Sequence, residues 1–242
     1  MKKGTLKQIL LITDGCSNTG EDPKATAALA SQQGLTINVI GIMEDGRDNP
    51  ESLREVEEIA LAGGGMSRIV YQETLARTVQ MVTRQAMTHT IQGFINKELE
   101  QILGKGQTVE DLAPEKRGEV MEVVEEMGET CGLEVLVLVD TSASMRNKLE
   151  TVKDSLIDLS ISLGSRIGEN RFSIYQFPGE CEEVEKIFDW SPNLNAIAEI
   201  FPKLKTGGIT PTGPAIREAM YEFGKLSLSR NVRDDAWRIE EA

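Results

Sequence analysis

The chain has 242 residues, 40% of them hydrophobic and 27% charged, which is the composition of a globular protein able to bury a sizeable core. Its formal net charge of −13 argues against nucleic acid and anionic membrane surfaces as partners, because both would repel it. No apolar run reaches the ~20 residues of a membrane span, and Ile9–Ile12 is too short for a signal peptide, so we expect a cytoplasmic protein.

Short runs rich in Ile, Val and Leu predict strands, and stretches of helical periodicity separate them. The strand candidates are Ile9–Ile12, Ile37–Met43, Ile69–Tyr71, Leu133–Val139 and Phe172–Phe177, with Val184–Trp190 as an antiparallel edge strand. The helix candidates are Pro23–Gln33 before Gly34, Pro50–Ala62 before three glycines, the stripes Leu75–Ile102 and Leu149–Leu163, and Pro214–Phe223. This alternation predicts an α/β fold with a doubly wound, mostly parallel sheet and helices on both faces.

Two segments lie outside this alternation. Residues 91–132 have no strand signal, a break at Gly104-Lys105-Gly106, and a second acidic helix with Val123 and Val124 on its apolar side. We interpret them as a helical connector that packs at least one face onto the sheet domain. Residues 225–242 mix charges without clear periodicity, which predicts a frayed helix or a disordered tail.

The most informative segment is LEVLVLVDTSASM, residues 133–145, in which an apolar strand ends in Asp140 and is followed by Ser142 and Ser144. Open α/β sheets bind their ligands in loops just past the carboxyl ends of strands. One carboxylate and two hydroxyls offer hard oxygen ligands of modest charge, which suits Mg²⁺. The alternative is that these polar residues only cap the helix that starts near Asn147.

This D-x-S-x-S pattern after a buried strand resembles the metal-ion-dependent adhesion site of von Willebrand factor A domains. The family pattern includes a threonine in a later loop, and Thr210 in GGITPTG, residues 207–213, matches it, while Thr212 is assigned to the following turn. The family's last ligand is an aspartate after a further strand. KQILLITDG, residues 7–15, resembles that strand, with Asp14 in the ligand's place; taken alone, Asp14 is equally typical of a tight turn.

The resemblance implies a circularly permuted, bacterial type of von Willebrand factor A domain, whose halves occur in reversed order. Residues 1–90 supply the second half and residues 133–224 the first, with residues 91–132 as connector and 225–242 as tail. Because the termini of such domains lie close together on the surface, joining them and opening an exposed loop is tolerated. The implied metal ligands, all at one sheet edge, are Asp140, Ser142, Ser144, Thr210 and Asp14.

The resemblance further implies a protein-binding module and not an enzyme. In the family, the metal keeps an open coordination position that an acidic side chain of a partner completes, so we expect Mg²⁺ or Mn²⁺ and an unidentified protein partner that supplies a carboxylate. One alternative is a Mg²⁺-dependent phosphohydrolase with Asp140 as nucleophile. Against it, residue 142 is serine where a second carboxylate is usual, and no GxxxxGK[ST] phosphate loop is present. A metal-free scaffold is the third alternative.

The sequence leaves open how the two halves meet. The connector can fold back within one chain and give a monomer, or extend to a neighbour and give a half-swapped homodimer with two complete sites. Closure within one chain is favoured, because Gly104 and Gly106 allow the helices to turn back and intramolecular pairing has a high effective concentration.

Cysteine and histidine are too few for the common catalytic and zinc centres. Cys16, Cys131 and Cys181 are an odd set without CxxC spacing, which favours reduced thiols. Cys16 lies near the candidate site, but thiols are poor Mg²⁺ ligands, so we predict a packed small residue. His89 is the only histidine, and we predict that it lies on a helix surface and serves no Ser-His-Asp or Cys-His centre.

Overall fold

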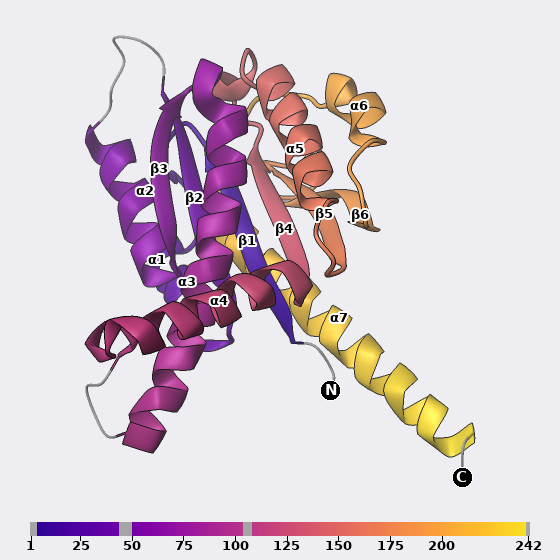
Figure 1. Cartoon of the computed structure of the whole chain (residues 1–242). Coiled ribbons are helices and arrows are strands. Elements are labelled where there is room, and N and C mark those ends of the chain that lie inside the picture. The colour runs from indigo at the N-terminus through magenta and orange to yellow at the C-terminus, as the bar shows by residue number, and fades with distance from the viewer. Residues whose placement is uncertain (1–3, 44–49, 104–107, 241–242) are drawn as a thin grey trace.

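The apolar runs of the sequence form six strands, which are β1 (Thr5–Thr13), β2 (Thr36–Met43), β3 (Gly64–Tyr71), β4 (Gly132–Asp140), β5 (Asn170–Phe177) and β6 (Glu185–Ser191). Figure 1 shows the computed structural model, which describes residues 4–43, 50–103 and 108–240. The helices are α1 (Pro23–Gln32), α2 (Pro50–Ala62), α3 (Leu75–Leu103), α4 (Pro114–Thr130), α5 (Leu149–Leu163), α6 (Ile197–Ile200) and α7 (Thr212–Glu240).

The strands form one sheet in the order β3-β2-β1-β4-β5-β6. β1 and β4 are the two central strands and run parallel, with Ile9 opposite Leu136 in the register. β6 alone runs antiparallel, at the edge beside β5. The predicted α/β fold with a mostly parallel sheet and an antiparallel edge strand is therefore confirmed. The two central strands belong to distant segments that meet within one chain.

Each face of the sheet is covered by helices, because the strands are apolar on both faces. Along β1, Leu10 and Ile12 point to the face covered by α3 and α5. Ile9 and Leu11 point to the opposite face, where α1, α2 and α7 pack. Figure 1 shows this three-layer arrangement, with α3 and α5 in front of the sheet.

Local sequence signals set the ends of the helices on the second face. The carboxylate of Asp22 accepts a hydrogen bond from the backbone N of Lys24 and caps α1, which ends before Gly34 at a φ of +78°. After α2, a Cβ at Gly65 would lie 2.1 Å from the carbonyl oxygen of Ile37. A side chain at Gly65 would therefore separate β3 from β2.

The connector between the two segments begins inside a helix. α3 runs through the expected boundary at residues 90 and 91 without a break, and Ile91 is still buried. The expected break at Gly104-Lys105-Gly106 lies outside the described residues. α4 packs mainly on α3. Val124 is its fully buried residue, whereas Val123 is 48% exposed, so α4 buries a much narrower face than its apolar pattern predicted.

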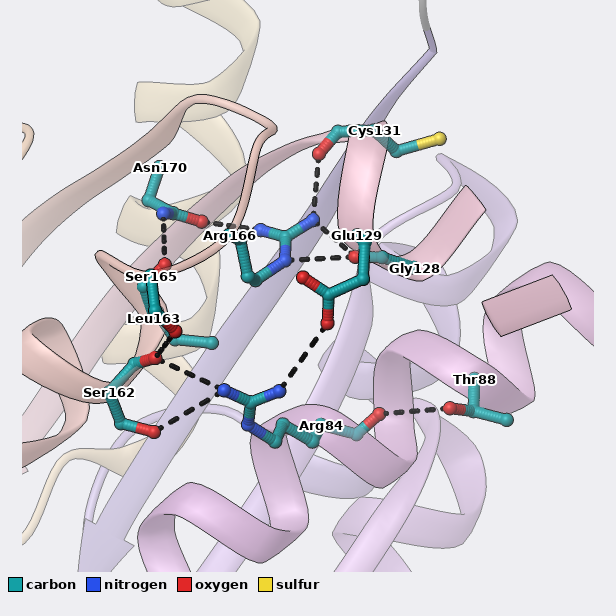
Figure 2. A network of polar contacts seen from close by, with 10 residues as sticks. All are labelled: Arg84, Thr88, Gly128, Glu129, Cys131, Ser162, Leu163, Ser165, Arg166 and Asn170. Atoms are coloured by element: carbon teal, nitrogen blue, oxygen red, sulfur yellow. Dashed lines mark hydrogen bonds and ion pairs between the residues drawn. The ribbon is translucent and has the colours of Figure 1, made fainter. Parts of the chain in front are cut away.

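Hydrogen bonds attach the end of α4 to the sheet domain (Figure 2). The guanidinium of Arg166, in the loop after α5, donates to the carbonyl oxygen of Gly128 from Nε at 2.8 Å and to that of Cys131 from Nη2 at 2.8 Å. Arg84 of α3 donates to the carbonyl of Ser162 at 3.1 Å and lies 3.7 Å from the carboxylate of Glu129. The last carbonyls of a helix have no hydrogen-bond donors within the helix, and Arg166 supplies donors at the end of α4.

The last helix is longer than the sequence pattern suggested. Instead of ending near Phe223, α7 continues through Glu240 and projects past the sheet in Figure 1. Phe223 is 2% exposed and closes the apolar face of α7 against the core. Within the described ranges, no helix combines the length and the apolar character needed to cross a bilayer.

Candidate metal-binding site

β4 ends in Asp140 at the carboxyl edge of the sheet, and Asp140 is fully buried. Its Oδ1 accepts a hydrogen bond from the backbone N of Ser142 at 2.8 Å, and its Oδ2 accepts one from Oγ1 of Thr13 at 2.6 Å. Burial raises the pKa of Asp140 from 3.8 to about 6, although both hydrogen bonds act to lower it. Thr13 is the last residue of β1, so the ends of both central strands fix this carboxylate.

A chain of polar contacts connects this loop to Asp14. Oγ of Ser142 lies 3.2 Å from Oγ of Ser144. Oγ of Ser144 in turn donates to Oδ1 of Asp14 at 2.8 Å. Asp14 follows β1 and Ser144 follows β4, so the contact joins the exits of the two central strands.

Lys148, just before α5, lies against the other oxygen of Asp14. Its Nζ donates to Oδ2 of Asp14 in an ion pair whose two side chains are 3% and 2% exposed. The sequence analysis did not single out Lys148. A signal was present, because Lys148 lies four residues before Val152 and therefore on the helix face that the buried stripe predicts.

The loop that carries Thr210 lies beside the loop that follows β1. The backbone N of Thr210 donates to Oδ1 of Asn18 at 2.8 Å, and its carbonyl accepts from the backbone N of Asn18 at 3.2 Å and from Oγ of Ser17 at 3.3 Å. On the other side, the backbone N of Gly207 donates to the carbonyl of Thr141 at 3.0 Å. Thr210, which is 5% exposed, is thus positioned at the same sheet edge as the β4 carboxylate.

Helix α2 supports the loop after β1 from outside. Oε1 of Glu55 accepts a hydrogen bond from the backbone N of Ser17 at 2.7 Å, and burial raises the pKa of Glu55. Sγ of Cys16 lies 3.2 Å from Oγ of Ser52, so Cys16 packs on α2. Asn18 and Glu55 carried no local sequence signal, because their role depends on loops and helices that meet only in the fold.

The structure brings the predicted residues to one edge of the sheet. Asp14, Ser142, Ser144 and Asp140 form one continuous polar network, and Thr210 is joined to it through its backbone and the loop after β1. Thr212 differs from the expectation that it serves the following turn. Its hydroxyl is buried without a hydrogen-bond partner among the described residues, so it gives that turn no hydrogen bond. His89 is exposed on α3, as predicted.

The side chains at this edge fit a hard divalent cation. Their donor atoms are carboxylate and hydroxyl oxygens, which Mg²⁺ and Mn²⁺ bind, and they lie within hydrogen-bond distance of one another. Across the described ranges, no group of three or more His, Cys, Asp or Glu side chains could hold a metal ion. Hydroxyl oxygens of Ser142, Ser144 and Thr210 would therefore join Asp140 and Asp14 as ligands, with water in the remaining positions.

Comparison with known proteins agrees with this fold and site. Residues 135–232 match the family model described as the von Willebrand factor type A domain, and the chain belongs to that family. The match begins within β4 and spans Asp140, Ser142, Ser144 and Thr210, whereas Asp14 lies outside it. In this family, the metal-ion-dependent adhesion site binds a divalent metal.

Two bacterial proteins resemble the chain over nearly its whole length. Uncharacterized protein YabS of Bacillus subtilis (strain 168) is 61% identical over 242 residues, which are 100% of this chain and 99% of that protein. A crystal structure of an uncharacterized protein from Alicyclobacillus acidocaldarius subsp. acidocaldarius DSM 446 is 43% identical, with a TM-score of 0.84, and covers 94% of this chain and 97% of its own. The similarity to the Alicyclobacillus structure therefore extends to both segments of the chain that form the sheet.

A more distant structure has only a loose likeness. Proximal thread matrix protein 1 from the mussel byssus, solved with a zinc-occupied MIDAS motif, is 17% identical, with a TM-score of 0.27 over 85% of this chain and 43% of its own. At that score the arrangements differ too much for the two sites to be compared.

Proposed function

We propose that this chain is a protein-binding module that holds Mg²⁺ or Mn²⁺ at the carboxyl edge of its sheet. The residues that would hold the metal are Asp140, Ser142, Ser144, Thr210 and Asp14. When bound, the metal would offer an open position to a carboxylate of a protein partner. The observation that carries the proposal is the hydrogen-bond network that joins Asp140 to Thr13 and Ser144 to Asp14.

We also propose that the domain is circularly permuted. The family model matches the segment from β4 to α7, and β1 to β3 extend the same sheet from the side of β4. If the chain is followed from β4 to β6 and then from β1 to β3, Asp14 comes after a further strand, as the family pattern described above requires. Residues 1–90 then act as the second half of the domain and residues 133–224 as the first.

Binding is favoured over catalysis by the surroundings of Asp140. A phosphohydrolase nucleophile needs a carboxylate oxygen that can reach the phosphorus atom. Asp140 is 0% exposed, and each of its oxygens already accepts a hydrogen bond, from Thr13 and from the backbone of Ser142. Such a carboxylate is suited to orienting a cation and poorly suited to attack.

The proposal is tested by melting the protein with Mn²⁺, with Mg²⁺ and with excess chelator. At a metal concentration about 100 times Kd, binding stabilises the fold by ~2.7 kcal/mol, which raises the melting temperature by roughly 5–10 °C in a domain of this size. Asp140→Asn should abolish the rise. Asp154→Asn, at an exposed position of α5, is the matched control and should keep it.

The partner is tested with the same proteins as bait. Capture of a partner should require the metal, fail in excess chelator, and fail with Asp140→Asn while persisting with Asp154→Asn. The proposal is contradicted if neither metal changes the melting temperature of the wild-type protein. It is also contradicted if a partner is captured equally well in excess chelator.

A further inference from the structure

The ion pair between Lys148 and Asp14 places a fixed positive charge inside the candidate site. Both side chains are almost fully buried, so water screens this charge far less than it screens a surface lysine. The other oxygen of Asp14 accepts from Ser144, which is itself a candidate ligand. Asp14 therefore connects the ammonium group of Lys148 to the hydroxyl of Ser144, one of the groups that would hold the metal.

This charge changes the electrostatic balance of the site. Two ionised carboxylates, Asp14 and Asp140, together with one ammonium group leave a single negative charge. A divalent cation turns it into a single positive charge, which one further carboxylate cancels. Without Lys148, the two carboxylates would neutralise the cation completely and the site would attract an anion only weakly.

We propose that Lys148 weakens metal binding at this site and strengthens the binding of an anionic group to the bound metal. The inference rests on the proposed function and specifies how that site selects its partner. The charge of Lys148 leaves the metal-loaded site with a net positive charge, which favours a carboxylate as the partner's group. Lys148 is a specificity-determining residue here, since it acts on both ligands through its charge.

A cavity supports the second part of this proposal. It has a volume of about 330 Å³ and lies directly beside the ion pair, with Asp14, Ser144 and Lys148 in its wall together with Ile42, Ala143 and Asn147. A group that enters this cavity reaches the exits of β1 and β4 and the ammonium group from the same side. A carboxylate of a partner would therefore be attracted by both positive charges, whereas a neutral side chain would gain much less from them.

The test compares Lys148→Gln, which keeps a hydrogen-bond donor for Asp14 but loses the charge, with Lys148→Arg, which keeps the charge. Mn²⁺ affinity is measured by calorimetry at about pH 8, where a carboxyl with a pKa of about 6 such as Asp140 is ionised. We expect Lys148→Gln to bind Mn²⁺ ~10-fold or more tightly than wild type. Lys148→Arg should stay within about threefold of wild type.

The anion is tested with acetate in place of the partner. About 0.1 M sodium acetate, compared with sodium chloride of equal ionic strength, should strengthen Mn²⁺ binding to wild type and to Lys148→Arg more than to Lys148→Gln. Acetate complexes free Mn²⁺ equally in all three titrations, so this side reaction cancels. Thermal melts in chelator establish that each variant is folded.

The outcomes separate the two proposals. If wild type binds Mn²⁺ but the folded Lys148→Gln protein binds it equally or more weakly, Lys148 only anchors Asp14 and the inference is overturned. An equal effect of acetate on all three proteins overturns it as well. If none of the three binds Mn²⁺, the metal site of the proposed function fails, and this inference fails with it.

Discussion

Each carboxylate at the candidate site is oriented by a donor from another part of the chain. Asp140 of β4 accepts a hydrogen bond from Thr13 of β1. Asp14, which follows β1, accepts hydrogen bonds from Ser144 and Lys148, which follow β4. Residues that orient a metal ligand often matter nearly as much as the ligand, because they fix the direction in which its free oxygen lone pairs point.

At this scale we predict that Thr13→Val weakens Mn²⁺ binding by about 10–100-fold. The substitution keeps the shape of the buried side chain but removes the hydroxyl that lies 2.6 Å from Oδ2 of Asp140. Thr13→Ser keeps the hydroxyl and should bind within a few-fold of wild type. Calorimetric titration of the three proteins above the pKa of Asp140, which is about 6, provides the comparison.

Equal Mn²⁺ affinity in the valine and wild-type proteins would show that Thr13 contributes to the packing of the strand end and not to the ligand. A loss of the folded state in the valine protein is recognised separately, because its melting temperature in chelator would fall well below that of Thr13→Ser.

Among the elements, those with a continuous local pattern were predictable and those defined by tertiary packing were not. The bounds of α2 follow from Pro50 at its start and the glycines after Ala62, and most strands follow from their apolar runs. β3 is the exception, because it begins at Gly64, before its predicted run Ile69–Tyr71. The end of α7 did not follow, because Gly224 after Phe223 is typical of a helix end, whereas α7 continues through it. The exposure of Val123 depends on where α4 meets α3, which no local pattern encodes.

The site was predictable to a similar degree. Asp140, Ser142 and Ser144 are consecutive alternate residues after a strand, so their motif is local, and Asp14 and Thr210 followed from a family resemblance. Thr13 and Asn18 were missed, because each contacts a ligand or its loop from the other segment of the chain. Lys148 lies on the buried face of α5, but its pairing with Asp14 likewise joins the two segments. Such contacts exist only after β1 and β4 have paired.

The attachment of α4 to the domain makes a prediction at the scale of elements. Arg166 is 6% exposed and donates to the carbonyls of Gly128 and Cys131 and to Oδ1 of Asn170. Arg166→Met should lower the free energy of unfolding by at least ~2 kcal/mol, because buried acceptors lose their donor. Denaturant unfolding measures this loss.

The matched control is Arg54→Met, whose side chain is 79% exposed and, among the described residues, pairs with Glu58 on the helix surface. This change should alter stability by less than ~0.5 kcal/mol. Because Arg166 follows the carboxyl end of α5 while the candidate site precedes its amino end, the loss should be the same with Mn²⁺ and with chelator. A loss comparable to that of the Arg54 variant contradicts the role assigned to Arg166.

At the scale of the whole molecule, both segments contribute to both halves of the core. β1 and β4 are the central strands, and each covers one long edge of the other. Leu11 of β1 lies opposite Leu138 of β4, and both belong to the cluster beneath α1 and α7. The two segments should therefore unfold together in one transition, as a single domain does.

This gives the last prediction, which concerns Leu11→Ala. Removing a fully buried leucine leaves a cavity and destabilises by about 2–5 kcal/mol, which lowers the melting temperature by at least ~4 °C in a domain of this size. The change lies before residue 91, whereas Trp190 on β6 reports on the other segment. With Trp237→Phe as the background, Trp190 is the only tryptophan. Its fluorescence and the far-UV circular dichroism should then shift by the same amount.

If Trp190 instead kept its wild-type transition while part of the helical signal melted earlier, residues 133–224 would be stable without β1, and the proposal of one permuted domain would fail. Closure within one chain adds a second requirement, because a half-swapped dimer would melt at a temperature that rises with protein concentration. A melting temperature independent of concentration over a hundredfold dilution is expected of β1 pairing with β4 of its own chain, since no association step then contributes to the transition.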